Sequence, residues 1–65
     1  MRVTFDEEVN AAYIYLRAIE PGGVKYTIPL HDRSISLDFD REDRLVGIEV
    51  LDADRQLPPE LLPSS

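Results

Sequence analysis

Hydrophobic and polar residues alternate along most of the chain. A period of two over four to eight residues is typical of a β-strand with one buried face. The clearest case places Ile35, Leu37 and Phe39 on one face, with serine and aspartate on the other. The stretches that show this pattern are residues 2–6, 11–17, 24–30, 34–40 and 45–51. The alternation therefore predicts five strands.

The segments between these stretches are short and polar. None exceeds six residues, whereas a parallel crossover needs a dozen or more. We therefore expect a mainly β (small α+β) fold, an antiparallel β-meander of about five strands with a short C-terminal helix. Asn10 tolerates a positive φ in the first turn. Pro29 has no N–H to donate a hydrogen bond to a neighbouring strand, so the third strand is frayed or lies at an edge of the sheet. Gly47 inside the fifth strand indicates a bulge or a close backbone approach.

The last part of the chain has a different character. Residues 52–57 can form a helical turn, and residues 58–62 follow with proline at the start of a helix, where it is tolerated. Pro63 stops this helix. Three leucines form an apolar patch that can cover one sheet face: Leu57, Leu61 and Leu62. We expect a single domain over residues 1–65, with the sheet at about 2–51 and the helical tail at about 52–63.

The small size of the chain limits how it can be stabilised. A domain of 65 residues hides only about 60% of the surface that its unfolded chain exposes, so it usually needs a disulfide, a metal or a partner. With no cysteine and one histidine, disulfides and thiolate zinc sites are excluded and a histidine metal site is disfavoured. The second and fifth strands are apolar or aromatic on both faces, which one short helix cannot cover. We therefore expect a homodimer through the sheet face that bears Tyr13 and Tyr15.

The net charge of the chain limits the classes of partner that it can bind. Seven lysine and arginine residues stand against thirteen aspartate and glutamate residues, for a formal net charge of −6. The basic residues are scattered singly, which argues against nucleic-acid binding and permits a basic protein partner. No stretch approaches the ~20 apolar residues of a membrane span, and residues 1–6 lack the apolar core of a signal peptide. We expect a cytoplasmic protein that does not bind membranes.

Four segments of the sequence carry a family resemblance: Met1–Asp6, Ala11–Leu16, Leu37–Asp40 and Leu45–Ala53. The patterns A-x-Y-I-x-L and L-V-G-I-E-V-L-D are fairly specific together and weak separately. On these residues the chain resembles a family of short prokaryotic proteins, domain-of-unknown-function family 2283, over residues 1–57. The resemblance implies a small β-rich domain with no assigned activity and no accepted catalytic residues. Some relatives are discussed as candidate partners of small toxin-like proteins.

Residues 38–49 match a calcium-binding loop at several positions. Position 6 of such a loop should be glycine, to allow a sharp turn, but is Asp43 here. The flanking segments also read as strands, whereas helices flank a calcium loop of this kind. The simpler interpretation is a solvated hairpin. Ion binding is the alternative function, through Asp38, Asp40, Glu42 and Glu49.

His31 beside Asp32 has the residue types of a general base and its orienting carboxylate. Neighbours in a loop rarely adopt that geometry, and the chain contains no cysteine nucleophile. We expect His31 to be a surface turn residue. A small enzyme that uses His31 is the second alternative.

Tyr13, Tyr15 and Arg17 share one face of the second strand, and both residue types are enriched at the energetic centres of protein interfaces. With Leu61 and Leu62 of the tail, they are the interface residues that we expect. We expect no catalytic residue and no cofactor. The sequence therefore predicts a non-enzymatic, acidic, homodimeric protein-interaction module. One concrete version is an antitoxin-like neutraliser of a small basic protein.

Overall fold

The structure, a computed structural model, describes residues 1–62. Five antiparallel strands form one sheet and a short helical tail follows, so the expected fold class is confirmed. Each strand lies inside its predicted stretch, although the second ends at Tyr15 and the third begins at Tyr26. The elements are β1 (Arg2–Asp6), β2 (Ala11–Tyr15), β3 (Tyr26–Leu30), β4 (Ile35–Phe39), β5 (Leu45–Leu51), α1 (Ala53–Gln56) and the 3-10 helix η1 (Pro59–Leu61).

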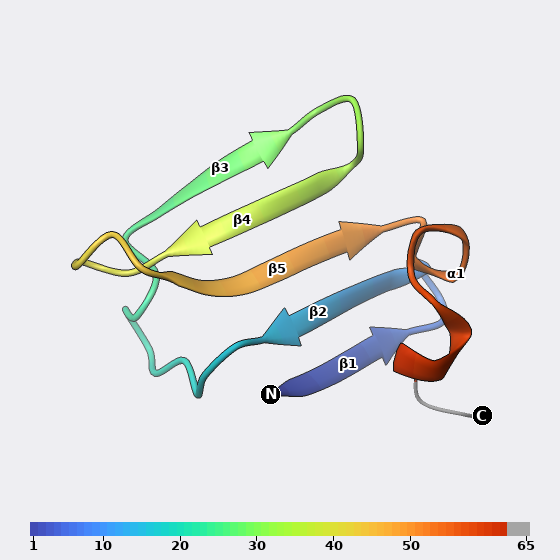
Figure 1. Cartoon of the computed structure of the whole chain (residues 1–65), viewed down its shortest axis with the longest axis horizontal. Coiled ribbons are helices and arrows are strands. Elements are labelled where there is room, and N and C mark those ends of the chain that lie inside the picture. The colour runs from blue at the N-terminus through green and yellow to red at the C-terminus, as the bar shows by residue number, and fades with distance from the viewer. Residues whose placement is uncertain (63–65) are drawn as a thin grey trace.

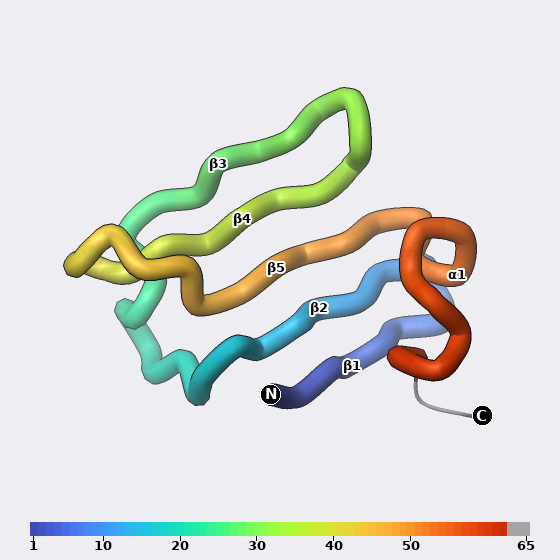
Figure 2. Tube along the Cα trace, in the orientation of Figure 1, coloured from blue at the N-terminus to red at the C-terminus, as the bar shows by residue number. Residues whose placement is uncertain are grey.

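The strand order departs from a simple meander at one place. The order is β1-β2-β5-β4-β3, so β5 lies beside β2 where a meander would put β3. Residues 16–25 connect β2 to β3 past the ends of β5 and β4 (Figure 1, Figure 2). The last four strands therefore form a Greek key, which a β1–β2 hairpin precedes. β5 is the longest strand, and its apolar side chains gain a partner strand on each side.

The core lies between the tail and one half of the sheet. Its buried cluster consists of Ala12, Ile14, Val50 and Ala53. Leu57 and Leu62 pack against this cluster from the tail, as expected, whereas Leu61 remains 38% exposed. Figure 1 shows the tail at one end of β1, β2 and β5, away from β3. The predicted stop at Pro63 lies outside the described residues.

Side-chain hydrogen bonds hold the tail in place. α1 has only four residues, and so short a helix is not stable by itself. The Asn10 side chain donates to Asp52 and Asp54 and accepts the backbone N–H of Asp54. The Gln56 amide donates to carbonyl groups of the β3–β4 turn and of the last residue of β5. These bonds fix α1 against three separate parts of the sheet.

The first turn and the third strand have the features that the sequence predicted. Asn10 has a φ of 53°, in the left-handed region, as its place in the first turn predicted. Pro29 lies in β3, an edge strand, so one of the two predicted outcomes for the third strand is confirmed.

Within the described residues, neither helical segment has the length and apolar character that crossing a bilayer requires.

Candidate functional site

The sheet face opposite the tail carries polar and aromatic side chains. Cross-strand register brings them side by side although they come from all five strands. We call this surface the tyrosine face, and its residues are Arg2, Tyr13, Tyr15, Thr27, Asp38, Gly47 and Glu49. The rings of Tyr13 and Tyr15 meet edge to face, with centroids 4.7 Å apart. The sequence predicted that these two tyrosines share a face, and the register places them so.

Tyr13 is engaged within its own chain. Its hydroxyl donates to Asp38 Oδ2 at 2.5 Å, and the Thr27 hydroxyl donates to Asp38 Oδ1 at 2.6 Å. Partial burial, and then the Asp38 carboxylate, raise the pKa of the Tyr13 phenol well above its usual value. A protonated phenol bonded to a carboxylate joins β2 to β4. It does not provide a free base or nucleophile.

The Tyr13 ring crosses β5 at Gly47. A Cβ atom at residue 47 would overlap the phenol oxygen of Tyr13. The register also shifts beside it, since Asp38 pairs with Gly47 but Phe39 pairs with Leu45, which marks a β-bulge. The bulge that the sequence suggested therefore lies beside Gly47, and the group that closely approaches the Gly47 backbone is the Tyr13 side chain.

Two arginines flank the outer end of the tyrosine face. The guanidinium carbon of Arg2 lies 4.4 Å from the centroid of the Tyr15 ring, a cation–π contact. Arg17 follows the end of β2 and pairs with Asp40 of the β4–β5 hairpin at 3.5 Å. Each arginine is thus directed by a neighbour from a different element.

The five predicted interface residues do not form one surface. Tyr13 and Tyr15 lie on the tyrosine face, and Arg17 turns toward the hairpin tip. Leu61 and Leu62 belong to the tail, and Leu62 packs into the core on the opposite face. Alternation predicted the faces of the strands, but it carries no information about the face that the tail covers.

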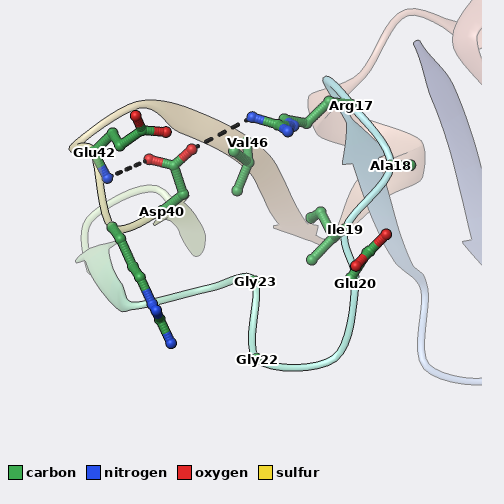
Figure 3. Close-up of a pocket in the computed structure, with 10 residues that line it drawn as sticks. Arg17, Ala18, Ile19, Glu20, Gly22, Gly23, Asp40, Glu42 and Val46 are labelled. Carbon is green, nitrogen blue, oxygen red and sulfur yellow. Dashed lines mark hydrogen bonds and ion pairs between the residues drawn. The ribbon is translucent and has the colours of Figure 1, made fainter.

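An open hollow of about 570 Å³ lies between the hairpin tip and the β2–β3 connection (Figure 3). Ile19 and Val46 point into it, and Arg17 pairs with Asp40 across its rim. Asp40 also accepts the backbone N–H groups of Arg44 and Glu42, and these bonds, with Arg17, hold the pKa of its carboxyl below the usual value. Because Asp40 is already bound by three groups, its carboxylate serves the turn and the ion pair rather than the hollow.

Two of the carboxylates of the suggested calcium loop take part in hydrogen bonds within the fold. Both oxygens of Asp38 accept hydroxyl hydrogen bonds on the tyrosine face, while Asp40 closes the turn. Asp43 adopts a positive φ, at the position where a calcium loop has glycine, and accepts a hydrogen bond from Tyr26. Within residues 1–62, no group of three or more acidic or histidine side chains is arranged to hold a metal ion. Asp38, Asp40, Glu42 and Glu49 are therefore not brought together as ligands.

His31 lies exposed in the turn between β3 and β4. In the described part of the chain, no side-chain hydrogen bond joins it to Asp32. The neighbouring Ser34 takes a positive φ as the turn closes. The geometry of a general base with an orienting carboxylate is thus absent at this place.

A comparison with family models decides the family. The model described as "Protein of unknown function (DUF2283)" matches residues 2–53. The chain belongs to the DUF2283 family. No curated protein matches the chain, and no solved structure matches it either. The DUF2283 match covers all five strands and ends at the first residue of α1.

β3 and β4 form the half of the tail-bearing face that the described residues leave largely open in this DUF2283 chain, although Ile35 packs against the core cluster. We call this half the apolar half-face, and its residues are Tyr26, Ile28, Leu30, Ile35, Leu37 and Phe39. Tyr26, Ile28 and Leu30 are 37%, 44% and 38% exposed. The rings of Tyr26 and Phe39 stack, with centroids 5.2 Å apart.

Alternation placed Ile35, Leu37 and Phe39 on one face of the fourth strand, but it did not predict that this half of the sheet face stays largely open. A simple signal was present in the lengths of the elements. Five strands at about 4.8 Å spacing make a sheet roughly 20 Å wide, whereas one helix covers a strip about 10 Å wide. A tail as short as residues 52–62 therefore leaves part of the face open.

Proposed function

We propose that this DUF2283 protein is a non-enzymatic protein-interaction module that works as a homodimer, joined through the apolar half-face. The observation that carries the proposal is the run of exposed apolar side chains on β3, beside the half-buried ones of β4. Contiguous apolar surface of this kind is costly to leave in water and marks interaction sites. Burial against a partner would supply the second layer that the β3–β4 half of the sheet lacks.

The charge distribution favours a second copy as the occupant. The chain carries a net charge of −6, so two copies repel each other over most of their surfaces. The apolar half-face contains no charged side chain, and there two copies can meet without opposing like charges. A two-fold dimer uses the same patch on both chains. The small buried core gives an additional reason, since a chain of this size usually needs further burial.

The sequence instead predicted a dimer through the tyrosine face. Tyr13 is bonded to Asp38 and covers Gly47, so its hydroxyl and its ring already have partners. Glu49, exposed on the same face, would meet its own counterpart across a two-fold contact nearby. These contacts support the apolar half-face over the tyrosine face.

The test compares the mass of the protein in solution with that of two variants. Light scattering across a wide concentration range should give a dimer mass for the native chain. Ile28→Asp should shift the protein to monomer, because it places a buried charge in the interface. Val9→Asp is the matched control, since Val9 is 65% exposed in the β1–β2 turn. A native chain that stays monomeric, or a dimer that Ile28→Asp leaves intact, would overturn the proposal.

The contacts of the polar groups support a non-enzymatic role. The Tyr13 phenol, Asp38 and Asp40 each take part in hydrogen bonds that shape the sheet or the hairpin. Catalytic sites instead present a nucleophile or base with an orienting partner in a cleft. His31 has no such partner among the described residues. His31→Ala should therefore behave as the native protein in a broad activity screen.

Neutralisation of a small basic protein is the second function that we propose. Five carboxylates gather at one end of the sheet: Asp6, Glu7, Glu8, Asp52 and Asp54. Asn10 draws the last two toward the β1–β2 turn, although Asp52 also pairs loosely with Arg55 at 3.9 Å. The negative electrostatic potential of these carboxylates would speed the approach of a basic partner. Purification of the tagged protein from its native cells should yield one small basic protein that high salt displaces, and a preparation without it would contradict this role.

A further inference from the structure

Two neighbouring hollows lie along the outer part of the tyrosine face. One has a volume of about 250 Å³ and is lined by Tyr13, Tyr15, Ile19 and Val24. The other, of about 410 Å³, is lined by Tyr15 and Ile19 again, with Arg2 and Arg17. The two hollows share Tyr15 and Ile19, so they adjoin each other. Together we call them the Tyr15 groove.

The Tyr15 groove has an apolar half and a basic half. Its apolar half is made of two tyrosine rings and two aliphatic side chains. Its basic half holds two arginines of a chain with only seven basic residues. No acidic residue lines either hollow, although the chain has thirteen. The lining of the groove therefore carries two basic side chains and no carboxylate, although Arg17 is paired with Asp40.

Both arginines are partly ordered before any ligand arrives. Arg2 is stacked on the Tyr15 ring at 4.4 Å, which leaves the edge of its guanidinium free to donate. Arg17 is oriented by Asp40 at 3.5 Å through one of its terminal nitrogens. A guanidinium has five N–H donors in a fixed fork, so one carboxylate partner does not exhaust it. Ordered donors lose less entropy when they bind an anion.

We propose that the Tyr15 groove binds a carboxylate that is attached to an aromatic ring or to another apolar group of that size. The carboxylate would lie between Arg2 and Arg17, and the ring would pack on Tyr15, Ile19 and Val24. Arginine forks match carboxylate geometry. A cavity of about 150 Å³ is enough for benzene, so the apolar hollow has room for one ring. Small-molecule sites generally combine an apolar lining with a few polar groups of this kind.

Nucleic acid fits the same groove poorly. A polyanion would place further phosphates beside Glu20 and Asp40, which line the neighbouring hollow, and the net charge of −6 would repel it. A single carboxylate carries one charge and ends within the basic half. The chemistry that the groove recognises is thus an apolar group with one terminal anion, which a small acid or the end of a peptide chain can supply.

The test is a titration of the full chain with phenylacetate, followed by amide NMR. We expect saturable shifts at Tyr15, Arg17, Ile19 and Val24. Phenylacetamide has the same ring without the charge and should bind at least tenfold more weakly, since a charge-assisted contact is lost. The proposal is overturned if no amide of the groove shifts, if the shifts fall elsewhere, or if the two probes bind alike.

Variants test the two arginines separately from the fold. Arg2→Gln and Arg17→Gln should each weaken phenylacetate binding by about three- to tenfold, because both side chains are partly exposed and the contact is screened by water. Arg33→Gln removes the same charge at an exposed position in the β3–β4 turn and should leave the affinity unchanged. An equal effect of all three substitutions would mean that only the net charge matters, and would refute the site.

A second pair of probes identifies the source of the ligand. A short peptide that ends in phenylalanine is compared with the same peptide as its C-terminal amide. Tighter binding of the free-acid peptide than of phenylacetate assigns the groove to chain ends, and the reverse assigns it to small acids. The groove and the apolar half-face lie on opposite faces of the sheet, so the titration can be repeated on Ile28→Asp. Loss of the dimer without loss of binding would separate the two proposals.

Discussion

Gly47 illustrates how one residue can determine a contact between two others. Tyr13 lies on β2 and Asp38 on β4, and β5 runs between them. The phenol reaches the carboxylate only because residue 47 has no side chain beneath the ring. Gly47 therefore contributes through the space that it leaves, and the Tyr13–Asp38 hydrogen bond depends on it.

Gly47→Ala should destabilise the protein by about 1–3 kcal/mol, the usual cost of forcing an extra group into a filled site. The Tyr13 ring would have to move, and it would lose its bond to Asp38. In a Tyr13→Ala background the same Gly47→Ala change should cost less than about 1 kcal/mol, because the obstructing ring is gone. Urea unfolding of the four proteins of this cycle measures the coupling. Additive effects would show that the ring and residue 47 do not interact.

The sequence allowed part of this contact to be predicted. Glycine inside an alternating stretch indicated a bulge or a close backbone approach, and the structure shows a bulge beside Gly47 and the Tyr13 ring over its backbone. The identity of the approaching group depended on which strands are neighbours. Connection length favoured β2 beside β3, whereas the structure puts β5 there. The pairing of Tyr13 with Asp38 follows from that order, and local pattern does not contain it.

At the scale of elements, the β4–β5 hairpin is organised around Asp40. Its Oδ1 accepts the N–H groups of Glu42 and Arg44, at 2.8 and 3.0 Å, and its Oδ2 faces Arg17. The acidic spacing that resembles a calcium loop is explained here by turn formation, since aspartate side chains commonly bond the backbone two residues ahead. The Asp40 carboxylate also holds the β2–β3 connection in place through its ion pair with Arg17.

Asp40→Ala should lower the melting temperature more than Asp40→Asn, because asparagine keeps an acceptor for the two N–H groups. The pKa of Asp40 is below its usual value in the folded chain, mainly through the N–H of Arg44. Its ionised form therefore stabilises the fold above the unfolded pKa of about 3.9, and this stabilisation is lost as the pH falls through the lower, folded pKa. Thermal melts from neutral to strongly acidic pH should show the native chain converging on Asp40→Asn. A constant difference at every pH would contradict this linkage.

Elements and their cover were not equally predictable from sequence. Period-two alternation located all five strands because the side-chain period is a local property of the backbone. Pro29 indicated an edge, and β3 is one. The cover of the sheet is not local, since it depends on where a short tail docks. Asn10 and Gln56 decide that docking through bonds to residues distant in the sequence.

At the scale of the whole molecule, one sheet has two unequal faces. The tail and β1, β2 and β5 enclose most of the core, to which β4 adds Ile35, while β3 lies beyond it (Figure 1). The molecule measures 34 × 25 × 18 Å, so it is flattened along the direction that a second layer would fill. The two proposed binding surfaces are separated accordingly, with the apolar half-face on one side of the sheet and the Tyr15 groove on the other.

If the second layer is another copy, the stability of the fold must depend on protein concentration. Only folded chains form the dimer, so mass action raises the melting temperature as the concentration rises. Each tenfold increase adds about 1.4 kcal/mol per dimer, and for a domain of this size that corresponds to roughly 3–6 °C. Calorimetry of the native chain and of Val9→Asp should show this slope, whereas Ile28→Asp should melt at one temperature at every concentration. A native chain with no slope would be stabilised by its own small core alone, and the apolar half-face would then need a different partner.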